Sequence, residues 1–236
     1  MLLTVLALVV AVIFLFAMVL AYRRAQVLTP TPPCRETLLP FQTVFGARPP
    51  LWMAVRAADP QRVQAALGLN RAAPCSWSEG MTGRREFFVG PPIAGWIIVT
   101  GAGPPNPSCD VDKCFIFLTR MSRQLGQIQY FQADRILHHH AWARAENGVV
   151  TRAYAWAGET IWSQGLKTAA EIELSMKCFG YGEDPDMNLW ASVEWARANV
   201  GKVPLLATNW SLDPARINER VRNHADGIAG ESSRVI

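Results

Sequence analysis

The sequence predicts an α+β protein in which an N-terminal transmembrane helix precedes one domain, with helices packed on an antiparallel or mixed sheet. Three observations predict this class. Residues 1–22 carry no charged side chain, strand-like and helical segments are mixed after residue 50, and Asn147-Gly148 joins two strand-like segments as a tight hairpin turn. With half of its 236 residues hydrophobic and 18% charged, the chain is neither disordered nor fibrous.

Residues 1–24 are predicted to be a membrane anchor. About 20 apolar residues cross a hydrocarbon core of ~30 Å as a helix, and Arg23 and Arg24 follow the apolar run. A cleaved signal peptide is the alternative, but no Lys or Arg precedes the run, which exceeds the usual core of about 7–15 residues. The bilayer is therefore the first expected partner. Because the arginines follow the run, the positive-inside rule places the remaining chain in the cytoplasm.

Residues 25–50 are predicted to be a stalk, and residues 51–236 a single α+β globular domain. The stalk contains Pro30, Pro32, Pro33, Pro40, Pro49 and Pro50, which together forbid a continuous helix. A segment of this composition is semi-extended and is expected to hold the domain away from the bilayer.

The first half of the domain reads as strands and helices in alternation. Residues 51–57 read as a strand, and Asp59-Pro60 starts a helix with an N-cap and a first-position proline. Residues 70–85 read as a loop. The strands then continue at 86–89, 96–100 and 128–131, and a helix is expected over 111–125, ended by Gly126.

The second half contains the hairpin and further helices. Residues 138–145 and 149–156 flank Asn147-Gly148, and Thr168 with Glu171 forms a capping box for a helix to Phe179. Another helix is expected over 187–200. The same pair of an N-cap Asp and a first-position Pro recurs at Asp184-Pro185 and Asp213-Pro214, and predicts a helix start at each.

The hairpin offers the best candidate binding surface. Aromatic and arginine side chains dominate recognition surfaces, and this chain has nine tryptophans, most of which are expected in the core. The candidate binding residues are Trp142, Arg144, Arg152, Tyr154, Trp156 and Glu159.

A catalytic site and a metal site remain alternatives. Cys75 on a loop could act as a thiolate nucleophile with His140 as base and Glu159 beside it. On a strand, His138 and His140 would share one face and could supply two ligands of a zinc site. Packed imidazoles and a buried, unreactive thiol are the simpler interpretations.

No cofactor and no nucleic acid are expected. Gly101-Ala102-Gly103 follows a strand as a dinucleotide fingerprint would, but Asn106 replaces the third glycine and prolines prevent a helix from starting. The net charge of +4 is too small and too scattered to predict nucleic-acid binding.

Several motifs together resemble a group of uncharacterised bacterial proteins. These motifs are Pro74-Cys75-Ser76-Trp77-x-Glu79-Gly80, Pro91-Pro92-x-x-Gly95-Trp96, Gln129-Tyr130-Phe131, His140-Ala141-Trp142-Ala143 and Arg152-Ala153-Tyr154-Ala155-x-x-Gly158-Glu159. The resemblance covers roughly residues 50–182. It implies a bacterial source, hence the inner (cytoplasmic) membrane, and one compact domain, but it carries no activity.

The functional hypothesis is a single-pass, membrane-anchored binding or accessory module that belongs to a membrane assembly and binds a protein partner through the aromatic and arginine-rich sheet surface. The alternative is a hydrolase-type enzyme that uses Cys75 or the histidine strand.

Overall fold

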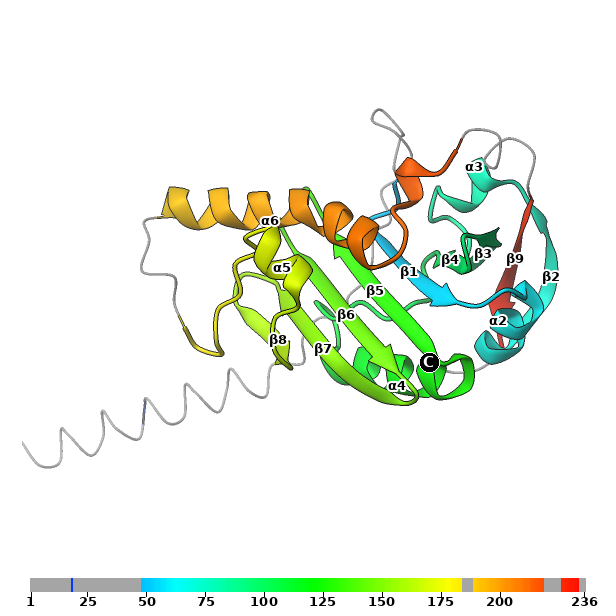
Figure 1. The fold of residues 1–236 in the computed structure, drawn as a ribbon, viewed down its shortest axis with the longest axis horizontal. Helices are drawn as coiled ribbons and strands as arrows, with labels where there is room; N and C mark the ends of the chain where they lie inside the picture. Colours follow the sequence, from blue (N-terminus) through cyan, green and yellow to red (C-terminus); the bar gives the residue numbers. More distant parts are fainter. Residues whose placement is uncertain (1–17, 19–47, 184–188, 219–225, 234–236) are drawn as a thin grey trace, which may run out of the picture. The chain divides into compact units, whose positions relative to one another are not determined.

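The computed structural model describes residues 18, 48–183, 189–218 and 226–233 (Figure 1). By its internal contacts the chain divides into residues 1–37 and 38–236, and the second unit contains every described strand. The anchor and most of the stalk lie outside the described residues, as does Asp184-Pro185. Within the described ranges, no helix combines the length and the apolar character needed to cross a bilayer.

The domain is α+β, as predicted, and its described strands form one nine-stranded antiparallel sheet in the order β2-β9-β3-β4-β1-β5-β6-β7-β8. The strands are β1 (Leu51–Arg56), β2 (Leu69–Cys75), β3 (Phe87–Ile93), β4 (Trp96–Thr100), β5 (Gln127–Ala133), β6 (His140–Glu146), β7 (Val149–Trp156), β8 (Thr160–Gln164) and β9 (Gly227–Ser232). The helices are α2 (Pro60–Leu67), α3 (Trp77–Gly80), α4 (Val111–Leu125), α5 (Ala169–Glu173), α6 (Leu189–Trp210) and the 3-10 turn η1 (Pro214–Arg216).

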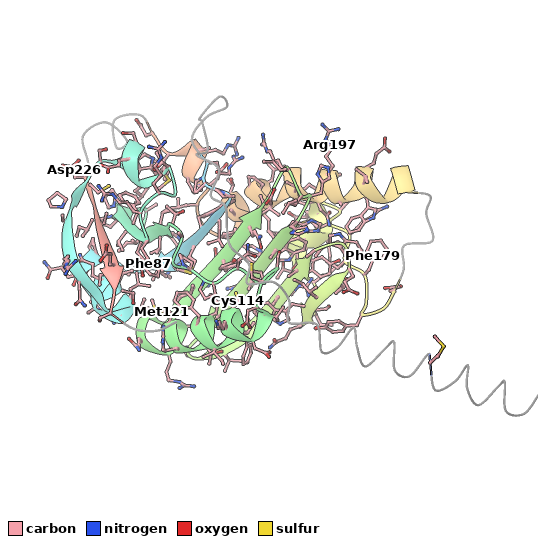
Figure 2. All side chains as sticks on the ribbon, turned by 180° about the vertical axis from the view of Figure 1, so that it is seen from behind. Phe87, Cys114, Met121, Phe179, Arg197 and Asp226 are labelled. Carbon is pink, nitrogen blue, oxygen red and sulfur yellow. The ribbon has the colours of Figure 1, made fainter. Side chains whose placement is uncertain are left out.

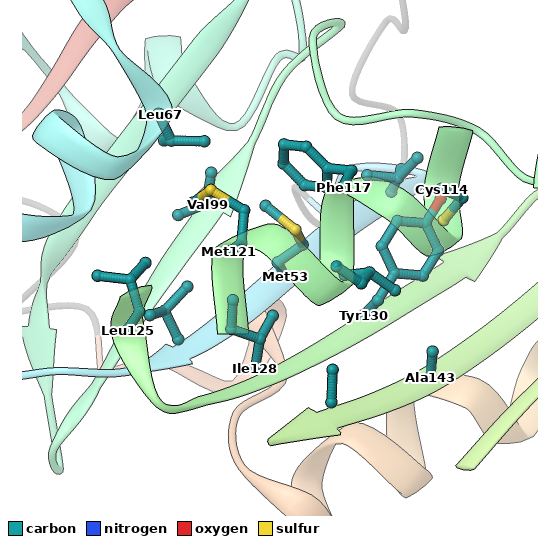
Figure 3. Close-up of a cluster of buried hydrophobic side chains, with 14 of the residues drawn as sticks. Met53, Leu67, Val99, Cys114, Phe117, Met121, Leu125, Ile128, Tyr130 and Ala143 are labelled. Atoms are coloured by element: carbon teal, nitrogen blue, oxygen red, sulfur yellow. The ribbon is translucent and has the colours of Figure 1, made fainter. Parts of the chain in front are cut away.

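Both faces of the sheet are apolar, so helices cover both. On one face, α2 packs against β2 and β3, and α4 packs against β5, β6 and β7. Met53, Met121 and Tyr130 lie in the core on this face (Figure 3). Cys114 and Met121 lie on the side of α4 that faces the sheet, whereas Arg197 lies on the solvent side of α6 (Figure 2). On the other face, α3, α5 and α6 cover a second core rich in tryptophan.

Local signals placed most of the central elements correctly. Asp59 caps α2 by accepting a hydrogen bond from the backbone N–H of Gln61, and the capping box of Thr168 and Glu171 is complete. Asn147 and Gly148 have φ angles of 50° and 86°, as a type I′ turn requires, so the predicted hairpin is confirmed.

Other boundaries were wrong. The expected loop over 70–85 contains β2 and α3, and neither β8 nor β9 was predicted. The helix opened by Thr168 ends at Glu173, well before Phe179, and Asp213-Pro214 opens only a 3-10 turn. In contrast, α6 runs past residue 200 and through Pro204, because burial of the helix face that follows outweighs a local cost of about 3 kcal/mol.

Candidate functional site

The structure brings the candidate binding residues of the hairpin together, but most of them are buried beneath helices. In the antiparallel register Trp142 lies opposite Tyr154, and Arg144 lies opposite Arg152. The side chains of Trp142, Tyr154, Arg152 and Trp156 are all buried, because α5 and α6 pack over this face. Only half-buried Arg144 and exposed Glu159 reach solvent. The prediction of an open aromatic recognition surface is therefore wrong for this face.

A buried ion pair holds the centre of the covered face. Arg152 Nε donates to Glu171 Oε1 and Oε2 at 2.9 and 3.1 Å, and one terminal nitrogen donates to Oε1 at 2.6 Å. The other terminal nitrogen donates to three backbone carbonyls, those of Ala153, Gln164 and Gly165, at 3.0–3.2 Å. The guanidinium therefore fixes the strand pair β7–β8 and the short helix α5 with one side chain.

The carboxylate of Glu171 has all of its hydrogen-bonding capacity occupied by internal partners. Besides Arg152, its carboxylate accepts from Trp142 Nε1 at 2.8 Å and from the backbone and hydroxyl of Thr168 at 2.8 and 2.9 Å. Burial by itself raises the pKa of Glu171, but these hydrogen bonds and the Arg152 charge outweigh it and lower the pKa below its ordinary value. The carboxylate is thus a permanently ionised structural acceptor.

His140 is enclosed in the same core. Its ring stacks on Trp142 with centroids 5.8 Å apart, and Trp195 of α6 meets it edge-on at 5.8 Å. Nδ1 lies 3.2 Å from the backbone carbonyl of His138, so it carries the proton, and Nε2 accepts from Asn199 Nδ2 at 3.3 Å. Burial lowers the pKa of His140 to about 4, against a smaller opposing effect of the His138 carbonyl. The imidazole is therefore neutral and fully used by its partners.

Buried Tyr154 and half-buried Cys178 complete this polar cluster. The Tyr154 hydroxyl accepts from the backbone N–H of Phe179 at 3.2 Å, and Thr160 Oγ1 donates to the Phe179 carbonyl at 3.1 Å. Cys178 Sγ accepts from Arg152 at 3.3 Å. Burial raises the pKa of Cys178 to about 11, although Arg152 acts against it. A thiol in this state is protonated and poorly nucleophilic.

The alternative catalytic set is not assembled. Cys75 ends β2 at one edge of the sheet, and His140 begins β6, six strand positions away. Glu159 lies exposed in the turn between β7 and β8. Burial, followed by the nearby Glu79 charge, raises the pKa of Cys75, whereas a nucleophilic thiol needs the opposite shift. The residues of the hydrolase hypothesis therefore do not converge.

The alternative metal site is also not formed. Strand β6 begins at His140, whereas His138 lies in the preceding loop with a φ angle of 56°, so the two rings do not share a strand face. Throughout the described ranges, no group of three or more His, Cys, Asp or Glu side chains could hold a metal ion.

The sequence reasoning missed the two sheet edges, which differ in character. At β2 the register shifts between Asn70 and Ala73, Arg71 has a positive φ, and Pro74 lacks an N–H donor. At β8 the residues are Thr-Ile-Trp-Ser-Gln, with neither charge nor proline. The signal for β8 was available in its aromatic and β-branched composition, directly after Gly158.

The outward backbone of β8 has one described partner. Ser163 lies opposite Tyr154, and its N–H donates to the Tyr181 hydroxyl at 2.8 Å, while that hydroxyl lies 3.3 Å from the Ser163 carbonyl and can donate to it. Both backbone groups of Ser163 therefore point away from β7. Comparison with known proteins adds no further assignment, because no family model, curated protein or solved structure matches the chain.

Proposed function

We propose that this protein is a membrane-anchored binding module that recognises a protein partner through the edge strand β8. The observation that carries the proposal is the contrast between the two sheet edges. A strand at an edge presents unpaired backbone groups, and proteins normally protect such edges with bulges, charges or proline. Edge β2 has all three in its register shift, Arg71 and Pro74. Edge β8 shares a register shift, where β7 passes from Ala155 to Trp156, but has neither charge nor proline.

The chemistry of β8 suits addition of an extended peptide. Main-chain hydrogen bonds supply affinity in this mode, and neighbouring side chains supply specificity. Tyr181 offers Ser163 only a single hydroxyl, and its side chain is 63% exposed, so an incoming strand can displace it. Beside the edge, Phe115 of α4 is 39% exposed and packs on Trp162 with ring centroids 6.3 Å apart. This apolar flank would contact alternate side chains of the partner.

A binding role is preferred to the hydrolase alternative on geometric grounds. Cys75 and His140 lie six strand positions apart, and Glu171, His140 and Arg152 are saturated by internal partners. Buried polar groups that are fully paired rigidify a core and leave no group available to a substrate.

The edge proposal is tested by replacing Ser163 with proline in the full-length protein. Since the N–H of Ser163 faces outward, the substitution removes no bond to β7 but blocks a new strand. A photo-cross-linking amino acid at Ile161 should capture a protein in the native membrane, and Ser163→Pro should reduce the adduct at least tenfold.

Two controls accompany this experiment. Tyr181→Phe removes the capping hydroxyl and leaves the strand open, so capture should persist or increase. The same photo-cross-linker at Ala72, on the protected edge β2, should capture nothing. Equal capture at Ala72 and Ile161, or capture unaffected by Ser163→Pro, would contradict recognition through β8.

The anchoring and the topology form the second part of the proposal. The apolar, uncharged run of residues 1–22 supports a single span in a bacterial inner membrane, and the arginines after it support a cytoplasmic domain. Cys109, by contrast, takes part in a disulfide bond. This bond favours a domain on the outer side of the membrane, because disulfides persist in oxidising compartments. Protease added to sealed, right-side-out cells should leave the domain intact if the arginines set the topology. Digestion of the domain would place it outside.

A further inference from the structure

The turn between β5 and β6 exposes two adjacent aliphatic side chains. In this tip loop, residues 134–139, Ile136 is 73% exposed and Leu137 is 60% exposed. Asp134 Oδ1 accepts from the backbone N–H groups of both residues, at 2.8 and 2.9 Å. The backbone N–H of Asp134 donates to the carbonyl of His139 at 2.9 Å, which closes the loop. The two side chains are therefore held in water by a fixed turn.

The tip loop lies where the chain from the N-terminal segment enters the domain. The carbonyl of Pro50 accepts from the backbone N–H of Ala133 at 2.8 Å, at the base of the loop. Arg48 Nε donates to Asp213 Oδ1 at 2.8 Å, and Asp213 is buried, so the incoming chain is fixed there. The tip loop thus lies at the same end of the domain as Arg48 to Pro50, where the continuously described chain begins.

We infer that Ile136 and Leu137 dip into the interfacial layer of the bilayer that residues 1–24 span. The inference rests on the proposed membrane anchoring. A tether that leaves the domain beside the loop keeps the loop close to the lipid surface. Exposed Arg135 adds a cation beside the aliphatic pair, and Asp134 is occupied within the turn. Aliphatic side chains next to a cation match the apolar and anionic layers of a lipid surface.

Other exposed aliphatic residues provide an internal contrast. Val149 is 60% exposed and Leu166 is 90% exposed, yet both lie at the opposite end of their strands, near the turn of the β6–β7 hairpin and the end of β8. Exposure alone therefore does not select the tip loop. Its place beside the incoming chain does.

The test uses the full-length protein in vesicles of phosphatidylcholine and phosphatidylglycerol (7:3), with the fluorescent residue dansylalanine at position 137 or, as the matched control, at position 166. Lipids that carry a doxyl quencher should reduce emission from position 137 by at least half and shift it to the blue. Emission from position 166 should be unchanged. Both sites are exposed leucines, so neither substitution disturbs the core.

Flotation of the same samples separates the two proposals. If the protein floats with the vesicles and position 137 is quenched no more than position 166, the anchor stands and the inference about the tip loop is overturned. That result would mean that the stalk holds the domain away from the bilayer. If the protein does not float, the anchoring proposal fails, and the inference fails with it.

Discussion

Replacing Glu171 with Gln should lower the free energy of unfolding by about 3–5 kcal/mol, because it leaves the charge of Arg152 buried without a counter-charge. The side chain of Arg152 is only 4% exposed and that of Glu171 is fully buried, so water cannot replace the missing partner. Urea unfolding of the full-length protein in mild detergent, followed by tryptophan fluorescence, measures the effect.

Two further variants make this result specific. Glu79→Gln removes the partner of Arg85 in an ion pair whose side chains are both about half exposed, and should cost no more than about 1 kcal/mol. The double variant Arg152→Met, Glu171→Gln should be more stable than Glu171→Gln alone, since it removes the uncompensated charge. Equal losses from Glu171→Gln and Glu79→Gln would show that the buried pair contributes no more than a surface pair.

The domain should lose stability as the pH falls from about 6.5 to 4. The ordinary pKa of a histidine is 6.5, whereas burial lowers that of His140 to about 4, so between these values the unfolded chain binds a proton that the folded chain excludes. Stability is complete above the upper value and falls by up to about 3 kcal/mol at the lower one. Below pH 4.5 the lowered pKa of Glu171 adds a further loss in the same direction.

The pH dependence can be assigned with two histidine variants. His140→Phe retains a ring between Trp142 and Trp195 but cannot titrate, so its stability should change little between pH 6.5 and 4.5. His139 lies half-buried outside the core, and its pKa is lowered less, so His139→Gln should keep most of the dependence. Urea midpoints at intervals of half a pH unit measure both. An unchanged slope in His140→Phe would assign the effect to other groups.

Local signals predicted the parts of the fold that depend on neighbouring residues. Asp59-Pro60, Asn147-Gly148 and the capping box of Thr168 each act within a few residues, and each lies where it was expected. Strand β2 was interpreted as a loop because its sequence shows no alternation of apolar and polar residues. The structure gives the reason, since five of its seven residues are exposed. Strand β9 pairs with β2 and β3 across about 140–160 residues, which no local pattern reveals.

In the candidate site, too, the features set by neighbouring residues were predicted and those set by distant segments were not. The hairpin identified Trp142, Tyr154 and Arg152 as neighbours on paired strands, but the cover on them comes from Glu171 of α5 and Trp195 of α6. Alternation within a strand tells which side chains share a face, not which face a later helix covers. The prediction that His138 shares a strand face with His140 was wrong for a more local reason. The strand starts at His140, two residues later than its composition suggests.

The position of β9 also sets the order in which the domain can be completed. Among the described strands, β2 pairs with β9 alone, and β9 separates it from β3. During synthesis, the seven strands β1 and β3 to β8 can pair as they emerge, but β2 must wait for residues 227–232. Non-local pairing of this kind is slow, because a long loop is closed before any contact rewards it. The nascent chain therefore carries an unfinished sheet edge at β3, and an unpaired β2, until residues 227–232 have been synthesised.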